Sequence, residues 1–195
     1  MIYSLLRIIA AALLYVVFRL EVDGLNEVPD EGPAIIAANH KSWIDPVAIG
    51  VALRRRVCFM AKEELFRIPV FAGLLRMLYA FPVKRGAADV GALKYAIRLL
   101  RKNELLGIFV EGTRIKTEGI GDVKPGIYLL ARLSKAPVVL CAIRGSRPIF
   151  VHRFLPVPNK IKLVFRRFEA DPSALDEKEY LQLLKQQLEG MYSEA

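Results

Sequence analysis

Apolar and polar residues alternate along the chain in blocks that predict strands and helices in turn. Short apolar runs bounded by turn residues are typical of buried strands, and apolar positions at helical spacing are typical of amphipathic helices. Strands that alternate with helices favour an α/β fold, in which helices flank a largely parallel central sheet. The predicted strands are 34–38, 57–61, 81–83, 106–110, 137–143 and 162–168, and the predicted helices are 45–53, 69–79, 89–102, 125–133 and one in the tail that starts at 171–173.

The first twenty residues are predicted to form a membrane-associated helix, followed by a single α/β domain over residues 21–195. The segment is strongly apolar, yet the uncharged stretch between Arg7 and Arg19 comprises only residues 8–18. A helix needs about 20 apolar residues to span a bilayer. Because the few polar residues fall mostly within one arc of a helical wheel, we expect a helix that lies in the membrane interface rather than one that crosses it.

Composition and charge limit the classes of partner. The chain has 195 residues, enough for one domain, and 54% of them are hydrophobic, which excludes a disordered protein. The net charge is +9, and because residues 169–195 are acidic, the rest of the chain is strongly basic. A basic chain favours nucleic acid, an anionic membrane or a phosphorylated substrate as its partner. No nucleic-acid-binding motif occurs, and the aromatics are not interleaved with the basic residues, so we do not expect nucleic acid to bind.

The two cysteines, Cys58 and Cys141, both lie in apolar runs. So few cysteines exclude a disulfide framework and a zinc knuckle, and the spacing of histidines and acids does not form a convincing metal site. We therefore expect two buried free thiols, a reducing compartment and no bound metal.

A histidine directly follows the strand predicted at 34–38. His40 stands in the segment N-H-K-S-W-I-D-P, just before the helix that Asp45-Pro46 is expected to open. The carboxyl ends of strands are where α/β proteins place their sites, and imidazole is suited to accept a proton near neutral pH. If the loop folds back, Asp45 can accept a hydrogen bond from Nδ1 and leave Nε2 free for a substrate. The alternative is that Asp45 only caps the helix and His40 is an ordinary loop residue.

A second group of polar residues follows the strand predicted at 106–110. The segment E-G-T-R at 111–114 contains a carboxylate, a hydroxyl and a planar guanidinium that can hold phosphate in bidentate fashion. Its glycine allows a ligand to approach the backbone closely. A K-R pair at 84–85 likewise follows a short strand. Basic strand ends can also be solvated loops, and the sequence contains no Walker-type phosphate loop.

Together these segments resemble the PlsC-type lysophosphatidic acid acyltransferases, the 1-acyl-sn-glycerol-3-phosphate acyltransferase family. Each block is weak alone, but the four blocks follow one another in the family's order. The N-H-x-x-x-x-D block appears at 39–45, the apolar turn that ends in Arg at 81–85, and the F-P-E-G-T-R block as F-V-E-G-T-R at 109–114. The fourth block, an apolar stretch with P-V-V, appears as A-P-V-V at 136–139. The stretch K-x-E-L-x-x-x-P, at 62–69, also resembles the family.

The resemblance implies transfer of a fatty acyl chain from a thioester to the sn-2 hydroxyl of lysophosphatidic acid, which gives phosphatidic acid at the cytoplasmic face of a membrane. It implies that His40 is the general base and that Asp45 holds the imidazole tautomer. The acyl donor is acyl-CoA or an acyl carrier protein, and no bound cofactor or metal is required. An acidic carrier protein and anionic membrane lipid both suit a basic surface. The residues that the resemblance assigns to the acceptor are Lys62, Arg85, Glu111, Gly112, Thr113 and Arg114.

The resemblance covers roughly residues 30–145, and three positions depart from the family pattern. Val110 and Cys141 stand where Pro is common, and Ile115 stands where Ser often follows the third block. Because His40 and Asp45 are kept, the departures affect the choice of acceptor rather than the reaction. Another lysophospholipid or polar lipid therefore remains an alternative acceptor. A non-catalytic module that binds lipid phosphate is a further alternative, although binding phosphate needs no base.

Overall fold

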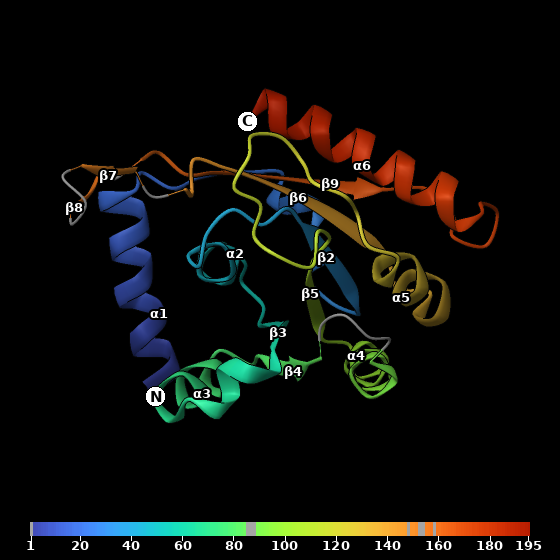
Figure 1. Cartoon of the computed structure of the whole chain (residues 1–195), viewed down its shortest axis with the longest axis horizontal. Coiled ribbons are helices and arrows are strands. Elements are labelled where there is room, and N and C mark those ends of the chain that lie inside the picture. Colours follow the sequence, from blue (N-terminus) through green and yellow to red (C-terminus); the bar gives the residue numbers. More distant parts are fainter. Residues whose placement is uncertain (1, 85–88, 148, 152–154, 158) are drawn as a thin grey trace.

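A single sheet runs through the middle of the molecule (Figure 1). The computed structural model describes residues 2–84, 89–147, 149–151, 155–157 and 159–195. Within these ranges seven strands form one sheet in the order β1-β9-β6-β2-β5-β3-β4, and only the β6–β9 pair is antiparallel. The predicted, largely parallel sheet is confirmed. The strands are β1 (Glu21–Asp23), β2 (Ala34–Ala38), β3 (Val57–Lys62), β4 (Phe81–Val83), β5 (Leu105–Phe109), β6 (Val138–Arg144) and β9 (Lys162–Phe168), and a separate hairpin holds β7 (Ile149–Val151) and β8 (Leu155–Val157).

Helices flank both faces of this sheet (Figure 1). One apolar cluster joins the sheet to α4, α5 and α6, and the other joins it to α2 and to the turn that follows α1. The four helices predicted between 45 and 133 are found within two residues of their predicted ends. The helices are α1 (Ile2–Ala12), α2 (Asp45–Ala52), α3 (Pro69–Met77), α4 (Val90–Arg101), α5 (Gly126–Ser134) and α6 (Glu177–Glu194).

Strands β2 and β5 form the centre of the sheet and decide where the polar loops meet. All five residues of β2, A-I-I-A-A, are buried. A parallel strand that is covered on both faces is apolar at every position, which explains why it appears as an unbroken apolar run. The two strands are parallel and in register, with Ala38 opposite Phe109. The loops that follow them therefore leave the sheet side by side.

The acidic tail differs from its predicted start. Helix α6 begins at Glu177, where Asp176 and Glu179 form a reciprocal capping box. The earlier acid, Asp171, accepts a hydrogen bond from the backbone of Ser173 and forms a local turn instead. Both acids are good turn formers, and only the second is followed three residues later by a glutamate. The sequence does not predict strand β1, because three residues are too few for a periodic pattern to be recognised.

The amino-terminal segment is a helix whose apolar side faces outward. Helix α1 continues into a π-helical turn, Leu13–Val17. The guanidinium of Arg7 points inward and donates to the carbonyls of Val51 and Leu53 at the end of α2. Ile8 and Val16 are 66% and 77% exposed. Among the described residues, no helix combines the length and apolar character that crossing a bilayer requires.

Candidate active site

The imidazole of His40 and the carboxylate of Asp45 form a buried pair. The distance from Nδ1 of His40 to Oδ2 of Asp45 is 2.8 Å, and the two residues are 8% and 0% exposed. The same oxygen accepts hydrogen bonds of 2.7 Å from the backbone N–H groups of Lys41 and Ser42. Because an ionised carboxylate can only accept, Nδ1 carries the proton and Nε2 keeps its lone pair. The loop folds back as the spacing of His40 and Asp45 allows.

Asp45 does not cap the helix it begins. Ile44 occupies the N-cap position of α2, and no side chain accepts a hydrogen bond there. Pro46 suits the first turn because it has no N–H to satisfy. The carboxylate is thereby free to turn back toward the loop. Beneath it, burial and the charge of Asp45 raise the pKa of the Cys141 thiol well above its usual range.

The plane of the imidazole is fixed by an aromatic stack. The ring of Phe109 lies parallel to that of His40, with 3.9 Å between the centroids and 14° between the planes. Phe59 stacks on Phe109 in turn, at 5.6 Å. Gly107 makes room for this stack, since a Cβ there would lie 2.3 Å from the Phe59 ring. The imidazole is thus held on one side by a carboxylate and on one face by β5.

Glu111 joins the loops that follow β2 and β5. Its side chain is 1% exposed. One oxygen accepts from the backbone N–H of His40 and the other from that of Gly121, both at 2.7 Å. The backbone N–H of Ile115 also donates to the carbonyl of His40. These contacts position His40; a contact of Glu111 with an acceptor lipid stays a prediction.

Asn39 anchors the same loop to the other neighbour of β2. Its amide donates to the carbonyl of Ile143 at 2.9 Å and accepts from the N–H of Ile143 at 2.7 Å. Because Ile143 belongs to β6, the start of the loop that carries His40 is tied to strands on both sides. The sequence shows Asn39 as part of a motif, but it does not indicate that the side chain anchors the loop to β6.

The segment 112–114 forms an exposed turn beside the His40 loop. Gly112 has φ of 68°, a left-handed conformation that favours glycine, and its N–H donates to the carbonyl of Phe109. Thr113 and Arg114 are exposed. The guanidinium of Arg114 lies over the indole ring of Trp43, 4.0 Å from its centroid. This arrangement brings a cation of the β5 loop against the β2 loop that carries His40.

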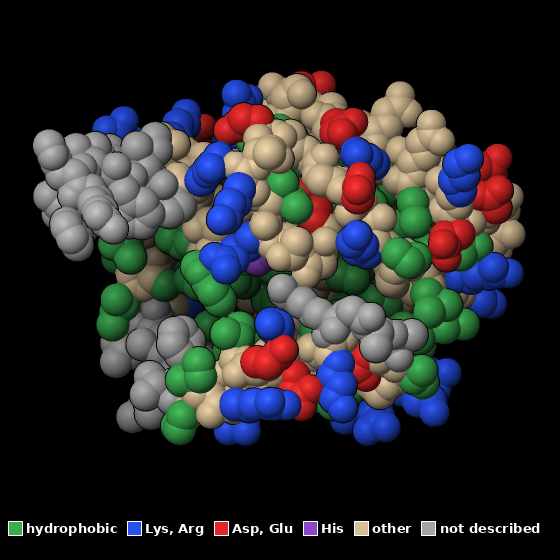
Figure 2. Space-filling model, viewed as in Figure 1, with side chains coloured by type: hydrophobic (Ala, Val, Ile, Leu, Met, Phe, Trp, Pro, Cys, Tyr) green, Lys and Arg blue, Asp and Glu red, His purple; other side chains and the backbone are tan. Residues whose placement is uncertain are grey.

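The remaining predicted cations are less closely tied to the pair. Lys62 ends β3, on the same edge of the sheet, and its ammonium pairs with Glu64 at 3.2 Å rather than with a residue of the His40 loop. Arg85 lies outside the described residues. Lysine and arginine side chains surround a hollow on this face of the molecule, in which a histidine side chain is visible (Figure 2).

The end of α6 supports the loop after β5. The Tyr192 hydroxyl donates to the carboxylate of Glu118 at 2.9 Å, and burial together with this carboxylate raises the pKa of Tyr192 to about 12. The Lys41 ammonium lies 5.6 Å from the Tyr192 ring and donates to the carbonyls of Thr117 and Gly119. The acidic tail, predicted as a structural helix, therefore contacts the site's surroundings.

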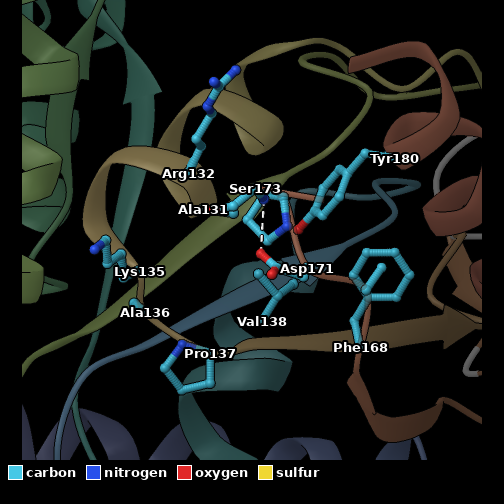
Figure 3. A pocket seen from close by; sticks show the side chains of 12 residues that line it. Ala131, Arg132, Lys135, Ala136, Pro137, Val138, Phe168, Asp171, Ser173 and Tyr180 are labelled. Carbon is cyan, nitrogen blue, oxygen red and sulfur yellow. Dashed lines mark hydrogen bonds between the residues drawn. The ribbon is translucent and has the colours of Figure 1, made fainter. Parts of the chain in front are cut away.

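A cavity of about 380 Å³ lies at the opposite end of the sheet, between α5 and α6 (Figure 3). Val138, the first residue of β6, and Phe168, the last of antiparallel β9, line it. Since β6 is parallel to β2, this cavity is remote from His40, which lies just beyond the carboxyl end of β2. The cavity is not part of the candidate site. No group of three histidine, cysteine or acidic residues that could hold a metal ion occurs in the part of the chain that the structure describes.

The sequence and the fold both match known proteins. Residues 19–144 match the model of the family described as Acyltransferase. The chain belongs to this acyltransferase family. It is 31% identical to the 1-acyl-sn-glycerol-3-phosphate acyltransferase of Bacillus subtilis (strain 168), over 87% of this chain and 84% of that protein. This result confirms the family that the four motifs predict.

Other members of the acyltransferase family are longer. The enzyme of the same description from Streptococcus pneumoniae is 32% identical over 74% of this chain, which spans 55% of that protein. In fold, the chain resembles the crystal structure of the 1-acyl-sn-glycerophosphate (LPA) acyltransferase PlsC from Thermotoga maritima, with a TM-score of 0.75 and 22% identity over 98% of this chain and 81% of that one. This likeness supports the fold alone.

Proposed function

We propose that the chain transfers a fatty acyl group from a thioester to the sn-2 hydroxyl of lysophosphatidic acid, giving phosphatidic acid. The observation that carries the proposal is the buried His40–Asp45 pair, which leaves Nε2 with its lone pair. A base with an orienting carboxylate is what activation of a hydroxyl needs. The names of the relatives favour lysophosphatidic acid over another lysophospholipid as acceptor.

In the proposed reaction, Nε2 of His40 takes the proton as the acceptor oxygen attacks the thioester carbonyl. The new C–O bond forms, the C–S bond breaks, and the proton passes from the imidazolium to the leaving thiolate. Asp45 stabilises the imidazolium while it exists, because its oxygen already accepts from Nδ1 at 2.8 Å. A positioned base accelerates such a reaction by about 10²–10⁴-fold. Orientation of the two substrates has to supply much of the remaining rate enhancement.

The acceptor phosphate is proposed to bind Arg114, with Lys62 and Arg85 as further cations. The exposed turn of Gly112 and Thr113 lies next to Arg114 and would border the phosphate. Charge-assisted hydrogen bonds contribute about 1.5–3 kcal/mol each. Two or three of them suffice to hold a lysolipid headgroup. The donor is acyl-CoA or an acyl carrier protein, and both are anionic.

Association with a membrane surface is proposed to occur through α1 and the turn after it. Arg7 turns toward α2, whereas Ile8, Ile9, Leu13 and Val16 are exposed. An apolar helix face open to solvent is unfavourable in water and favourable in the interfacial layer of a bilayer. The enzyme would then take its lysolipid acceptor from the cytoplasmic face, where acyl thioesters are made available.

The test is a product analysis with the full chain. Lysophosphatidic acid, lysophosphatidylcholine and monoacylglycerol are supplied in vesicles, each with acyl-CoA or with acyl carrier protein. We expect phosphatidic acid as the main product, with at least one donor. Vesicle binding without turnover of any acceptor would refute catalysis and favour a lipid-phosphate binding module. Preference for lysophosphatidylcholine or monoacylglycerol would refute the acceptor.

A further inference from the structure

One large aromatic side chain remains exposed in the middle of the buried catalytic loop. Trp43 is 58% exposed, whereas His40, Ser42 and Asp45 are each 8% exposed or less. Its ring instead faces the guanidinium of Arg114, 4.0 Å away. A tryptophan in this position contributes little to the core, so its contact with Arg114 is the interaction that requires explanation.

The stack leaves the hydrogen-bonding edge of Arg114 available. Guanidinium N–H groups lie in the plane of the group, and an aromatic ring contacts only its face. Within the described part of the chain, Arg114 makes no other hydrogen bond or ion pair. An exposed arginine otherwise samples many rotamers, and this freedom has to be lost when it binds an anion. Stacking restricts the side chain before the ligand arrives.

The contact also links the two halves of the site. Trp43 lies in the loop after β2, between the base and its carboxylate, and Arg114 lies in the loop after β5. A phosphate held by Arg114 would therefore be held at a defined distance from Nε2 of His40. In a lysolipid, the phosphate and the reacting hydroxyl are separated by a fixed number of bonds, so this distance matters for which hydroxyl reaches the base.

We propose that Trp43 is a positioning residue that holds the Arg114 guanidinium flat and edge-on for the acceptor phosphate. The inference rests on the proposed function and adds a residue to it. It assigns Trp43 no direct contact with the reacting atoms. An exposed tryptophan can also sit in a membrane interface, and the experiments separate that role from this one.

The first test compares acceptor kinetics for Trp43→Ala, Trp43→Phe, Arg114→Ala and the double variant. A cation–π contact at an exposed site corresponds to about a two- to fivefold change in affinity. We expect Trp43→Ala to raise KM for lysophosphatidic acid by about that factor with kcat within twofold. Trp43→Phe should recover most of the loss. In the Arg114→Ala background, removing Trp43 should have no further effect on KM.

The second test uses fluorescence, because Trp43 is the chain's single tryptophan. Lysophosphatidic acid and inorganic phosphate should each shift its emission in the native chain and leave the emission of Arg114→Ala unchanged. This result does not depend on turnover, so it fails independently of the proposed reaction. Unchanged KM in Trp43→Ala would overturn the inference. So would a rise in KM that persists in the Arg114→Ala background and parallels a loss of binding to phosphatidylglycerol vesicles, since Trp43 would then be a membrane contact.

Discussion

The loop after β2 and the loop after β5 each place a buried carboxylate at the same edge of the sheet, yet the two carboxylates have different partners. Asp45 accepts from the imidazole of His40, as well as from backbone N–H groups. Among the described residues, Glu111 accepts only from the backbone N–H groups of His40 and Gly121. Both carboxylates are buried, and both belong to motifs of the family. The partner therefore distinguishes a carboxylate that contacts an imidazole from one that only joins two backbone segments.

The difference between the two carboxylates is tested most strongly by neutralising Asp45. In Asp45→Asn the amide cannot both accept from Nδ1 and stabilise an imidazolium, so we expect kcat to fall by about 10²-fold or more. Asp122→Asn is the matched control, because Asp122 is exposed and its ion pair is with Lys185, at 3.7 Å. Steady-state kinetics with lysophosphatidic acid measures both. A loss in Asp45→Asn no larger than in the control would contradict the role of Asp45.

Neutralising Glu111 should instead lower stability. In Glu111→Gln one backbone N–H faces an amide NH₂ that cannot accept, and a buried unsatisfied donor costs about 1–3 kcal/mol. We expect the free energy of unfolding in urea to fall by about that amount. Glu189→Gln, on the exposed side of α6, should leave it unchanged. If Glu111→Gln kept full stability and lost only affinity for the lysolipid, Glu111 would be a substrate ligand as the motif predicts.

The two loops also differ in how much of them the sequence predicts. Strand ends and the family motifs place His40 and Asp45 together, because the residues are close in the chain and one of them has a distinctive chemistry. The bonds of Glu111 are not predictable in this way. They join residues about 70 positions apart, His40 and Glu111, and depend on the register of β2 against β5. The capping box of α6 is present in the sequence at Asp176 and Glu179, but Asp171 is followed by Pro172 and Ser173 and resembles a helix start equally well.

The inward turn of Arg7 is another feature that periodicity could not predict. A helical wheel places polar residues on the side facing water, and it does not include the carbonyls of Val51 and Leu53 that Arg7 contacts. Unsatisfied carbonyls at a helix end favour a cation. The polar residue therefore faces the protein, and the exposed side of the helix is apolar.

A smaller effect is expected from the ring that holds His40 in place. Phe109→Leu removes a stack at 3.9 Å, and aromatic pairs contribute about 0.5–1.5 kcal/mol. We expect kcat to fall by about two- to tenfold. Phe168→Leu, at the opposite end of the sheet, is the control for lost packing, and it should lower stability without changing kcat. Equal kcat values for the two variants would show that the stack does not position the base.

The smallest effect on stability is expected from the two buried thiols, Cys58 and Cys141. Burial raises the pKa of Cys58 to about 11, and burial and Asp45 raise the pKa of Cys141 well above its usual range. A thiol that stays protonated when folded but ionises when unfolded stabilises the fold less as pH rises above 9, the ordinary value. Iodoacetamide at pH 8.5 should therefore label both cysteines in urea and neither in the native chain, as measured by mass spectrometry. Rapid labelling of native Cys141 would mean that the interior beneath Asp45 is open.

The proposed acyl transfer depends most directly on His40 as the base. The measurement is the rate of phosphatidic acid formation by His40→Ala beside His152→Ala, which changes the chain's other histidine, a residue outside the described part of the structure. We expect His40→Ala to lose about 10²–10⁴-fold in kcat while remaining folded, and His152→Ala to match the native chain. A folded His40→Ala variant with native activity would contradict the proposed mechanism.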